Sequence, residues 1–167
     1  MKVKIKPRVL KGTIEIPPSK SYSHRAVIGA SLATSEKKSK ISNLKFSMDI
    51  KATMEIMENW GAKIIKGENS LEIIGNSGKI IPKDKYTKCS ESGSTIRFLI
   101  PVGLTSKNEL VFDGKGKLVD RPLDSYYKIF EKQGLFYETT DGKLPLTVNG
   151  ELKPGIYEID GNISAQF

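Results

Sequence analysis

The chain has 167 residues, of which 38% are hydrophobic and 28% charged, as expected for one globular domain with a sizeable core. It has no run of about 18 apolar residues, so no membrane span is expected, and its first residues lack the apolar stretch of a signal peptide. A single cysteine, Cys89, excludes an internal disulfide and indicates a reducing, cytoplasmic compartment, and with a single histidine no metal site is expected.

The formal net charge of +8 raises the question of nucleic-acid binding. The 27 basic residues are scattered among 19 acidic ones, and no helix-turn-helix, RNP-like or zinc-finger pattern is present. A basic surface that attracts small anions is the preferred interpretation, with no nucleic acid as partner. Nucleic-acid binding stays as a weaker alternative, which a shift assay would detect through its steep weakening with salt.

The first predicted helix begins within PPSKSYSHRA, residues 17–26. Lys20 and Arg25 lie in its first turn and a half, although the partial positive charge of a helix amino terminus favours acidic side chains there. A bound anion would resolve this conflict, with lysine as a compact charge, arginine as a bidentate donor and Ser21 as a hydroxyl donor. The alternative is a solvated basic helix face. His24 is expected to pack or to form hydrogen bonds, because no nucleophile–base pair is visible.

The sequence repeats at an offset of 73 residues. After each predicted second helix come two short strands around the turns KGEN and TDGK, whose glycines are expected at positive φ. Two units of helix, strand, helix and hairpin are therefore predicted, over about 19–78 and 90–150, and a third begins near residue 156. The positions that define the second helix and its glycine stop recur as pairs: Ile50 and Leu123, Met54 and Tyr127, Met57 and Phe130, Gly61 and Gly134.

Three helix starts share a serine-rich character: PPSKS, SESGS and DGNISAQ. Helix amino termini attract phosphate or carboxylate through unpaired N–H groups and the helix dipole. The alternative is that Ser19, Ser92 and Ser164 are simple N-caps, worth about 1 kcal/mol each. Because repeated units pack with like ends together, we expect the three helix starts to converge on one anion.

Several further residues are candidates for this site. Gly93 permits a ligand to approach the backbone closely, unless it is an ordinary loop glycine. Arg121 is another cation at a helix start. Arg97 either holds a carboxylate structurally or lines the site, and the sequence leaves both open. Asp49 and Glu91 either orient Lys20 or act as solvated caps.

Four motifs, PPSKSYSHRA, ESGSTIRFL, DRPLDSY and GNISAQF, closely resemble in this order the N-terminal part of the 5-enolpyruvylshikimate-3-phosphate synthase family. The resemblance covers essentially the whole chain, and the first motif separates this family from UDP-N-acetylglucosamine enolpyruvyl transferase, which shares the fold. It implies an α/β (α+β) fold of repeated βαβαββ units, three in each of two domains. Helix amino termini would face a cleft between those domains.

The resemblance also implies an activity. The enolpyruvyl group of phosphoenolpyruvate would pass to the 5-hydroxyl of shikimate 3-phosphate, releasing phosphate, without a metal or organic cofactor. The implied binding residues are Lys20 and Gln166 for both substrates, Ser21, Arg25 and Ser164 for shikimate 3-phosphate, and Gly93 and Arg121 for phosphoenolpyruvate.

Two departures from the family pattern affect these expectations. Ala165 stands where many members have a second serine, so one hydrogen bond to shikimate 3-phosphate is expected to be lost or replaced. The sequence ends at Phe167, before the family's acid–base carboxylates, catalytic lysine and further arginines. We therefore expect this chain to be a fragment that is nearly inactive alone. Residues 19–167 are expected to form a partial N-terminal domain, and residues 1–18 to belong with an absent C-terminal domain. A non-catalytic anion-binding module is the main alternative.

Overall fold

The computed structural model describes residues 3–4, 6–7, 9 and 11–159 of the chain. The elements of the first unit are α1 (Lys20–Leu32), β1 (Ser39–Ile41), α2 (Met48–Asn59), β2 (Lys63–Lys66) and β3 (Leu71–Ile74). Those of the second unit are β4 (Tyr86–Lys88), α3 (Gly93–Gly103), β5 (Leu110–Asp113), the short 3₁₀ helix η1 (Gly116–Leu118), α4 (Asp124–Gln133), β6 (Phe136–Thr140) and β7 (Lys143–Asn149). The predicted order of helix, strand, helix and hairpin is thus confirmed twice.

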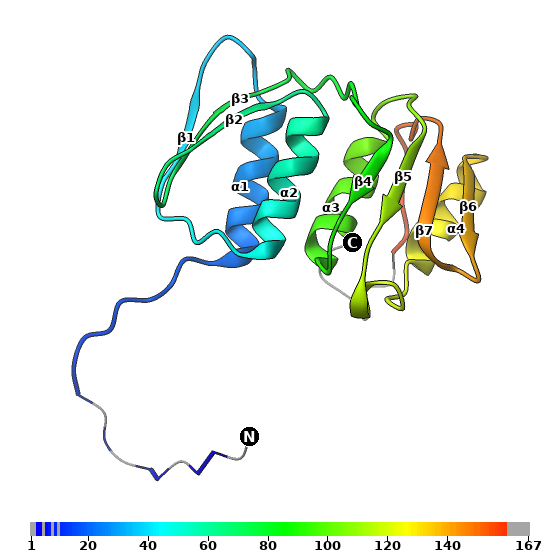
Figure 1. Cartoon of the computed structure of the whole chain (residues 1–167). Coiled ribbons are helices and arrows are strands. Elements are labelled where there is room, and N and C mark those ends of the chain that lie inside the picture. Colours follow the sequence, from blue (N-terminus) through cyan, green and yellow to red (C-terminus); the bar gives the residue numbers. More distant parts are fainter. Residues whose placement is uncertain (1–2, 5, 8, 10, 160–167) are drawn as a thin grey trace.

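Each unit has its own sheet. The first has the order β1-β3-β2 and is antiparallel throughout, whereas the second has the order β4-β5-β7-β6 with β4 parallel to β5. Helices α1, α2 and α3 lie side by side between the two sheets and start at the same end, the lower one in Figure 1. The strand β4 was not predicted. It completes a βαβαββ unit, whereas the equivalent stretch of the first unit, residues 13–15, forms no strand.

The hydrophobic core joins the two units. Its largest fully buried side chains include Trp60 from the end of α2, Phe112 from β5 and Phe130 from α4, all in one cluster. A smaller cluster around Ile50 and Leu71 lies inside the first unit. The predicted helix-face positions therefore point into the core, although Tyr127 is only half-buried.

The two hairpin turns differ from each other. Gly142 has φ 69° and follows Asp141 at φ 53°, as the prediction required. Gly67 is not at positive φ, so that part of the prediction was wrong. Its N–H donates to the carbonyl of Ser70 at 2.9 Å, which closes a wider turn without a left-handed residue.

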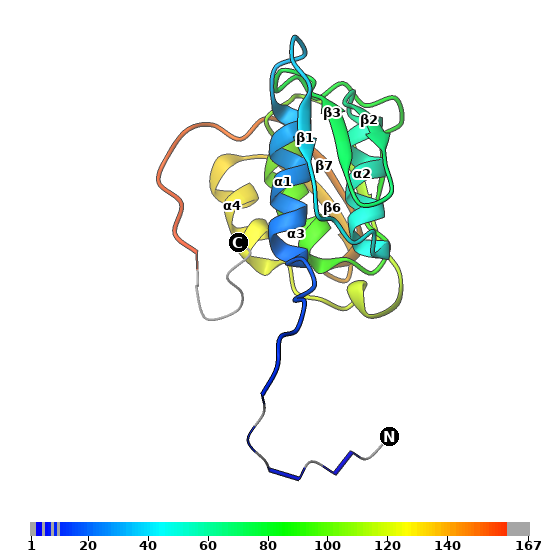
Figure 2. The same cartoon turned by 90° about the vertical axis from the view of Figure 1, so that its left-hand side faces the viewer.

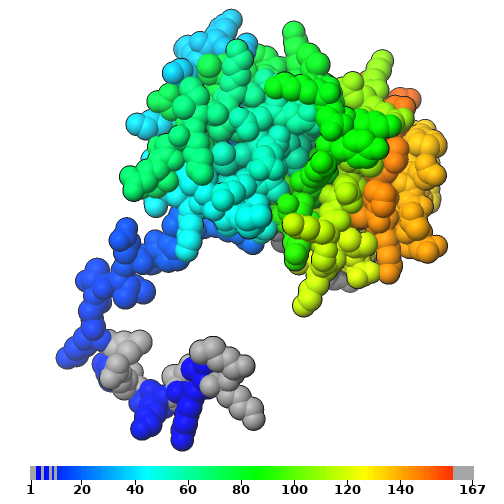
Figure 3. Space-filling model, in the orientation of Figure 1, coloured from blue at the N-terminus to red at the C-terminus, as the bar shows by residue number. Residues whose placement is uncertain are grey.

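The two ends of the described chain lack regular structure. The described residues before α1 are nearly all exposed and extend away from the body, with Ile14 at 83% exposure (Figures 1, 2 and 3). Residues 151–159 form neither helix nor strand, and the N–H of Leu152 donates to the carbonyl of Leu104 at 2.9 Å. The expected third unit beyond residue 159 lies outside the described residues. In the described part of the chain, no helix is long and apolar enough to cross a membrane.

Candidate anion-binding site

Lys20 forms an ion pair that links the start of α1 to the start of α2. It is the first residue of α1, and the first turn of that helix, all of it described, contains no acid. Its ammonium lies 2.7 Å from a carboxylate oxygen of Asp49, in the first turn of α2, with side-chain exposures of 56% and 26%. Asp49 therefore orients Lys20, one of the two possibilities left open by the sequence. Because an ion pair this exposed contributes only about 0–1 kcal/mol, the lysine is still available to an anionic ligand.

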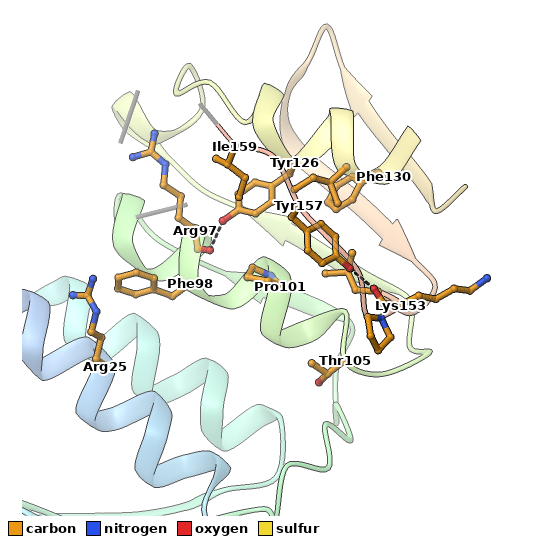
Figure 4. Close-up of a pocket in the computed structure, with 13 residues that line it drawn as sticks. Arg25, Arg97, Phe98, Pro101, Thr105, Tyr126, Phe130, Lys153, Tyr157 and Ile159 are labelled. Carbon is orange, nitrogen blue, oxygen red and sulfur yellow. Dashed lines mark hydrogen bonds between the residues drawn. The ribbon is translucent and has the colours of Figure 1, made fainter. Parts of the chain in front are cut away.

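Arg25 connects α1 to α3. Its guanidinium carbon lies 4.7 Å from the centre of the Phe98 ring, a cation–π contact that Figure 4 shows from the side. One of its nitrogens also donates to the carbonyl of Ser21 at 3.3 Å. Arg25 and Ser21 are both exposed. The face of α1 that carries these side chains is open to solvent, so a ligand can reach it.

Gly93 and Arg121 lie against each other. Gly93 is the buried first residue of α3, and a β-carbon placed on it would overlap the guanidinium of Arg121, whose central carbon would lie at 3.3 Å. The close approach expected at Gly93 is therefore made by an arginine of the loop before α4. Glu91, just before the N-cap, lies against Gly116 of η1 instead of pairing with Lys20.

Arg97 is a buried cation within α3. Burial, followed by the positive charge of Arg121, lowers the pKa of Arg97 from its ordinary value. Its backbone carbonyl accepts a hydrogen bond of 2.5 Å from the hydroxyl of Tyr126 in α4 (Figure 4). The guanidiniums of Arg97 and Arg121 therefore lie close enough for their positive charges to interact.

An apolar pocket beside α3 does not coincide with these residues. It has a volume of about 610 Å³ and lies between α3, α4 and the segment after β7 (Figure 4). Arg25 and Arg97 stand at its edge, but its walls are mainly apolar, with Phe98, Tyr126 and Phe130 among them. Lys20, Ser21, Gly93 and Arg121 are not part of its lining. The candidate anion site at the helix starts is therefore separate from this pocket.

His24 has the hydrogen-bonding role predicted for it. It is fully buried, and its Nδ1 lies 2.8 Å from the hydroxyl oxygen of Thr53 in α2. That hydroxyl lies 2.8 Å from the hydroxyl of Thr95 in α3, which in turn donates to the N-cap Ser92 at 2.7 Å. Thr53 and Thr95 were not identified from the sequence, because neither carries a recognisable motif.

Burial of His24 makes the stability of the chain sensitive to pH. Desolvation lowers the pKa of His24 to about 4, with Lys20 and Arg25 also lowering it and Asp49 raising it. Since the folded pKa lies below the unfolded one of about 6.5, this group stabilises the fold above pH 6.5 and loses that contribution as pH falls towards 4. The loss should approach about 3 kcal/mol, because one pKa unit is worth about 1.4 kcal/mol.

The variant His24→Asn isolates this effect, because the chain contains no other histidine. An asparagine amide can take the place of Nδ1 beside Thr53 but does not titrate. We expect urea unfolding to show a steeper decline in stability between pH 6.5 and pH 4 for the wild type than for His24→Asn. Parallel declines would show that the pKa of His24 is the same in the folded and unfolded chain, so that burial does not lower it.

The remaining two predicted binding residues, Ser164 and Gln166, lie outside the described residues, as does Ala165. The described part of the site therefore brings together Lys20, Asp49, Ser92, Gly93 and Arg121 through contacts between α1, α2, α3 and the loop before α4. Within the described residues, no group of three or more histidine, cysteine, aspartate or glutamate side chains could hold a metal ion.

A repeated mixed α/β fold that gathers cations at parallel helix starts defines a class of proteins suited to binding small phosphorylated anions. The model of the family EPSP synthase (3-phosphoshikimate 1-carboxyvinyltransferase) matches residues 5–167, and the chain belongs to this family.

Individual relatives support this family assignment, and a solved structure shows the same fold. A 3-phosphoshikimate 1-carboxyvinyltransferase of Clostridium kluyveri is 51% identical over 165 residues, which cover 99% of this chain and 38% of that protein. One of Clostridium acetobutylicum is 51% identical over 170 residues, covering 99% and 39%. The structure of an EPSP synthase from Acinetobacter baumannii has the same fold, with a TM-score of 0.79 at 24% identity, over 93% of this chain and 36% of that one. The chain thus spans less than two fifths of the length of these relatives.

Proposed function

We propose that this chain binds shikimate 3-phosphate and forms part of the site at which the enolpyruvyl group of phosphoenolpyruvate is transferred to the 5-hydroxyl of that substrate. Phosphate is the second product. The relatives that are about half identical carry the name of this activity. The observation that carries the proposal is the placement of Lys20 at a helix start, with Asp49 as its partner, beside a second helix start covered by Arg121.

The proposed roles follow from charge and position. Lys20, Ser21 and Arg25 bind the phosphate and hydroxyl groups of shikimate 3-phosphate, because they project from the open face of α1. Arg121 neutralises phosphoenolpyruvate at the start of α3, where Gly93 leaves room for its guanidinium. Ser164 and Gln166 complete the set. A phosphate placed between these groups would replace the half-buried carboxylate of Asp49 as the main partner of Lys20.

Catalysis needs a partner for this chain. We propose that a C-terminal domain supplies the acid–base groups and closes the cleft, and that residues 1–18 belong with it. General acid–base groups contribute about 10²–10⁴-fold in rate. The chain alone is therefore proposed to bind without appreciable turnover, in the cytoplasm, as part of aromatic amino-acid biosynthesis.

Calorimetry with two ligands tests the binding proposal. Shikimate 3-phosphate should bind to the purified chain, whereas shikimate, which lacks the phosphate, should bind at least about a hundredfold more weakly, since charge-assisted hydrogen bonds contribute about 1.5–3 kcal/mol each. Equal affinity for the two ligands, or no binding of either, would overturn the proposal. Appreciable phosphate release from both substrates, by chain purified from a host without this enzyme, would contradict the need for a partner.

A further inference from the structure

We infer that a buried relay of hydrogen bonds, from His24 through Thr53 and Thr95 to Ser92, positions the starts of α1, α2 and α3 around the anion site. The relay consists of these four side chains. This inference rests on the proposed function, because it concerns the residues that hold the ligand-binding groups in place. Its members are positioning residues and do not contact the substrates.

The relay crosses three helices in three short steps. The distances from His24 Nδ1 to Thr53 Oγ1, from Thr53 Oγ1 to Thr95 Oγ1 and from Thr95 Oγ1 to Ser92 Oγ are 2.8, 2.8 and 2.7 Å. All four residues are buried, with relative exposures of at most 1%. Both threonine hydroxyls also lie 3.3 Å from the backbone carbonyl of Asp49, so the start of α2 is tied into the same relay.

The relay has a preferred direction. Among the described residues, Nε2 of His24 is buried without a hydrogen-bond partner. If Nε2 carried the proton, a buried N–H would be left unsatisfied, and such orphaned donors are rarer in proteins than under-used acceptors. The proton therefore belongs on Nδ1, which donates to Thr53. Thr53 then donates to Thr95, and Thr95 donates to Ser92.

This direction determines what Ser92 can do. Its oxygen accepts from the hydroxyl of Thr95 and, at 3.2 Å, from the backbone N–H of Thr95, so it satisfies the start of α3 as an N-cap. With both lone pairs used, its own hydrogen is left to be donated. Desolvation keeps the pKa of His24 near 4, so His24 stays neutral at pH 7 and the direction is maintained.

Each member of the relay adjoins a residue of the anion site. His24 precedes Arg25, and Ser92 precedes Gly93. Asp49 has its backbone carbonyl 3.3 Å from both threonine hydroxyls and binds Lys20 through its carboxylate. A change of spacing between the helices would therefore move Lys20, Arg25 and Gly93 relative to one another. A displacement of about 1 Å is enough to impair a pre-organised site.

The test replaces each threonine by valine, which has the same shape without the hydroxyl. Thr53→Val and Thr95→Val should each lower the affinity for shikimate 3-phosphate about tenfold, the equivalent of one hydrogen bond. Thr53→Ser and Thr95→Ser should restore it. The matched control is Thr87→Val in β4, which removes another fully buried hydroxyl, one without a partner among the described residues. It should leave the affinity unchanged.

A second measurement tests the direction of the relay without any ligand. Nitrogen-15 NMR of the single histidine should show the proton on Nδ1 in the wild type, and Thr53→Val should alter that signal. A proton on Nε2, or unchanged affinity in folded valine variants, would overturn the inference. If the valine variants do not fold, the wild-type tautomer and the serine variants still decide it. A wild type that binds no shikimate 3-phosphate would instead contradict the proposed function, and the affinity comparison would then be made with inorganic phosphate.

Discussion

Replacing both Lys20 and Arg25 with methionine is expected to abolish binding of shikimate 3-phosphate and to leave the fold intact. Each cation should make charge-assisted hydrogen bonds with the ligand, worth about 1.5–3 kcal/mol apiece, so losing both lowers the affinity at least about a hundredfold. The fold should persist because Arg25 is exposed and Lys20 is 56% exposed in a pair worth about 0–1 kcal/mol. Calorimetry, with urea unfolding in parallel, measures both effects.

The matched control is the double variant Lys38→Met and Lys85→Met. These lysines pair with Glu72 and Glu109 at 3.2 and 2.8 Å and are 57% and 50% exposed, so the same charge is removed from exposed side chains. Lys38 follows the far end of α1 and Lys85 precedes β4, away from the helix starts. Their loss should change the affinity less than about twofold, because distant exposed charges are largely screened at 0.1 M salt. Equal losses in the two double variants would mean that net charge alone attracts the ligand.

Gly75→Ala is expected to destabilise the fold by about 3 kcal/mol, as severe overpacking does. Gly75 follows β3 and is buried against the end of α1, where an added β-carbon would lie 2.7 Å from the carbonyl carbon of Ala33 and 2.9 Å from the carbonyl oxygen of Ala30. These are backbone atoms and cannot turn aside. The N–H groups of the next two residues donate at 2.8 Å to carbonyls at the end of α1, so the clash would also break these caps.

Gly29→Ala is the control for this substitution. Gly29 lies inside α1 on its exposed side, and a β-carbon there would meet nothing within 4 Å. Since glycine is a poor helix former, alanine should stabilise the chain by about 0.5–1 kcal/mol. Urea unfolding of both variants separates the two effects. A loss of less than about 1 kcal/mol for Gly75→Ala would show that the end of α1 moves away from β3 at little cost.

The local elements were predictable because their signals are local. The apolar spacing of Ile50 and Met57 lies within α2, and the glycine stop at Gly134, which has φ 65°, is the cap of α4. The offset of 73 residues then predicted the second unit from the first. The strand β4 was missed because only three residues pair, and they do so with β5, more than twenty residues further along the chain.

The candidate site was predictable only in part. The conflict between cations and the helix dipole identified Lys20 and Arg25, because that conflict is visible in a few neighbouring residues. The contact of Arg121 with Gly93 and the burial of His24 depend on how separate helices pack. No pattern in the sequence marks Thr53 or Thr95, since a threonine inside a helix has many possible roles.

The sequence alone determined the repeated order of helices and strands, the basic helix starts and the expected preference for phosphorylated anions, because periodicity and charge act over a few residues. Only the tertiary structure decided that Asp49 holds Lys20, that Arg121 covers Gly93, and that His24 is joined to Ser92 through two threonines. Such pairings are decided when the buried faces of α1, α2 and α3 pack together, and that packing depends on the shape of the whole core.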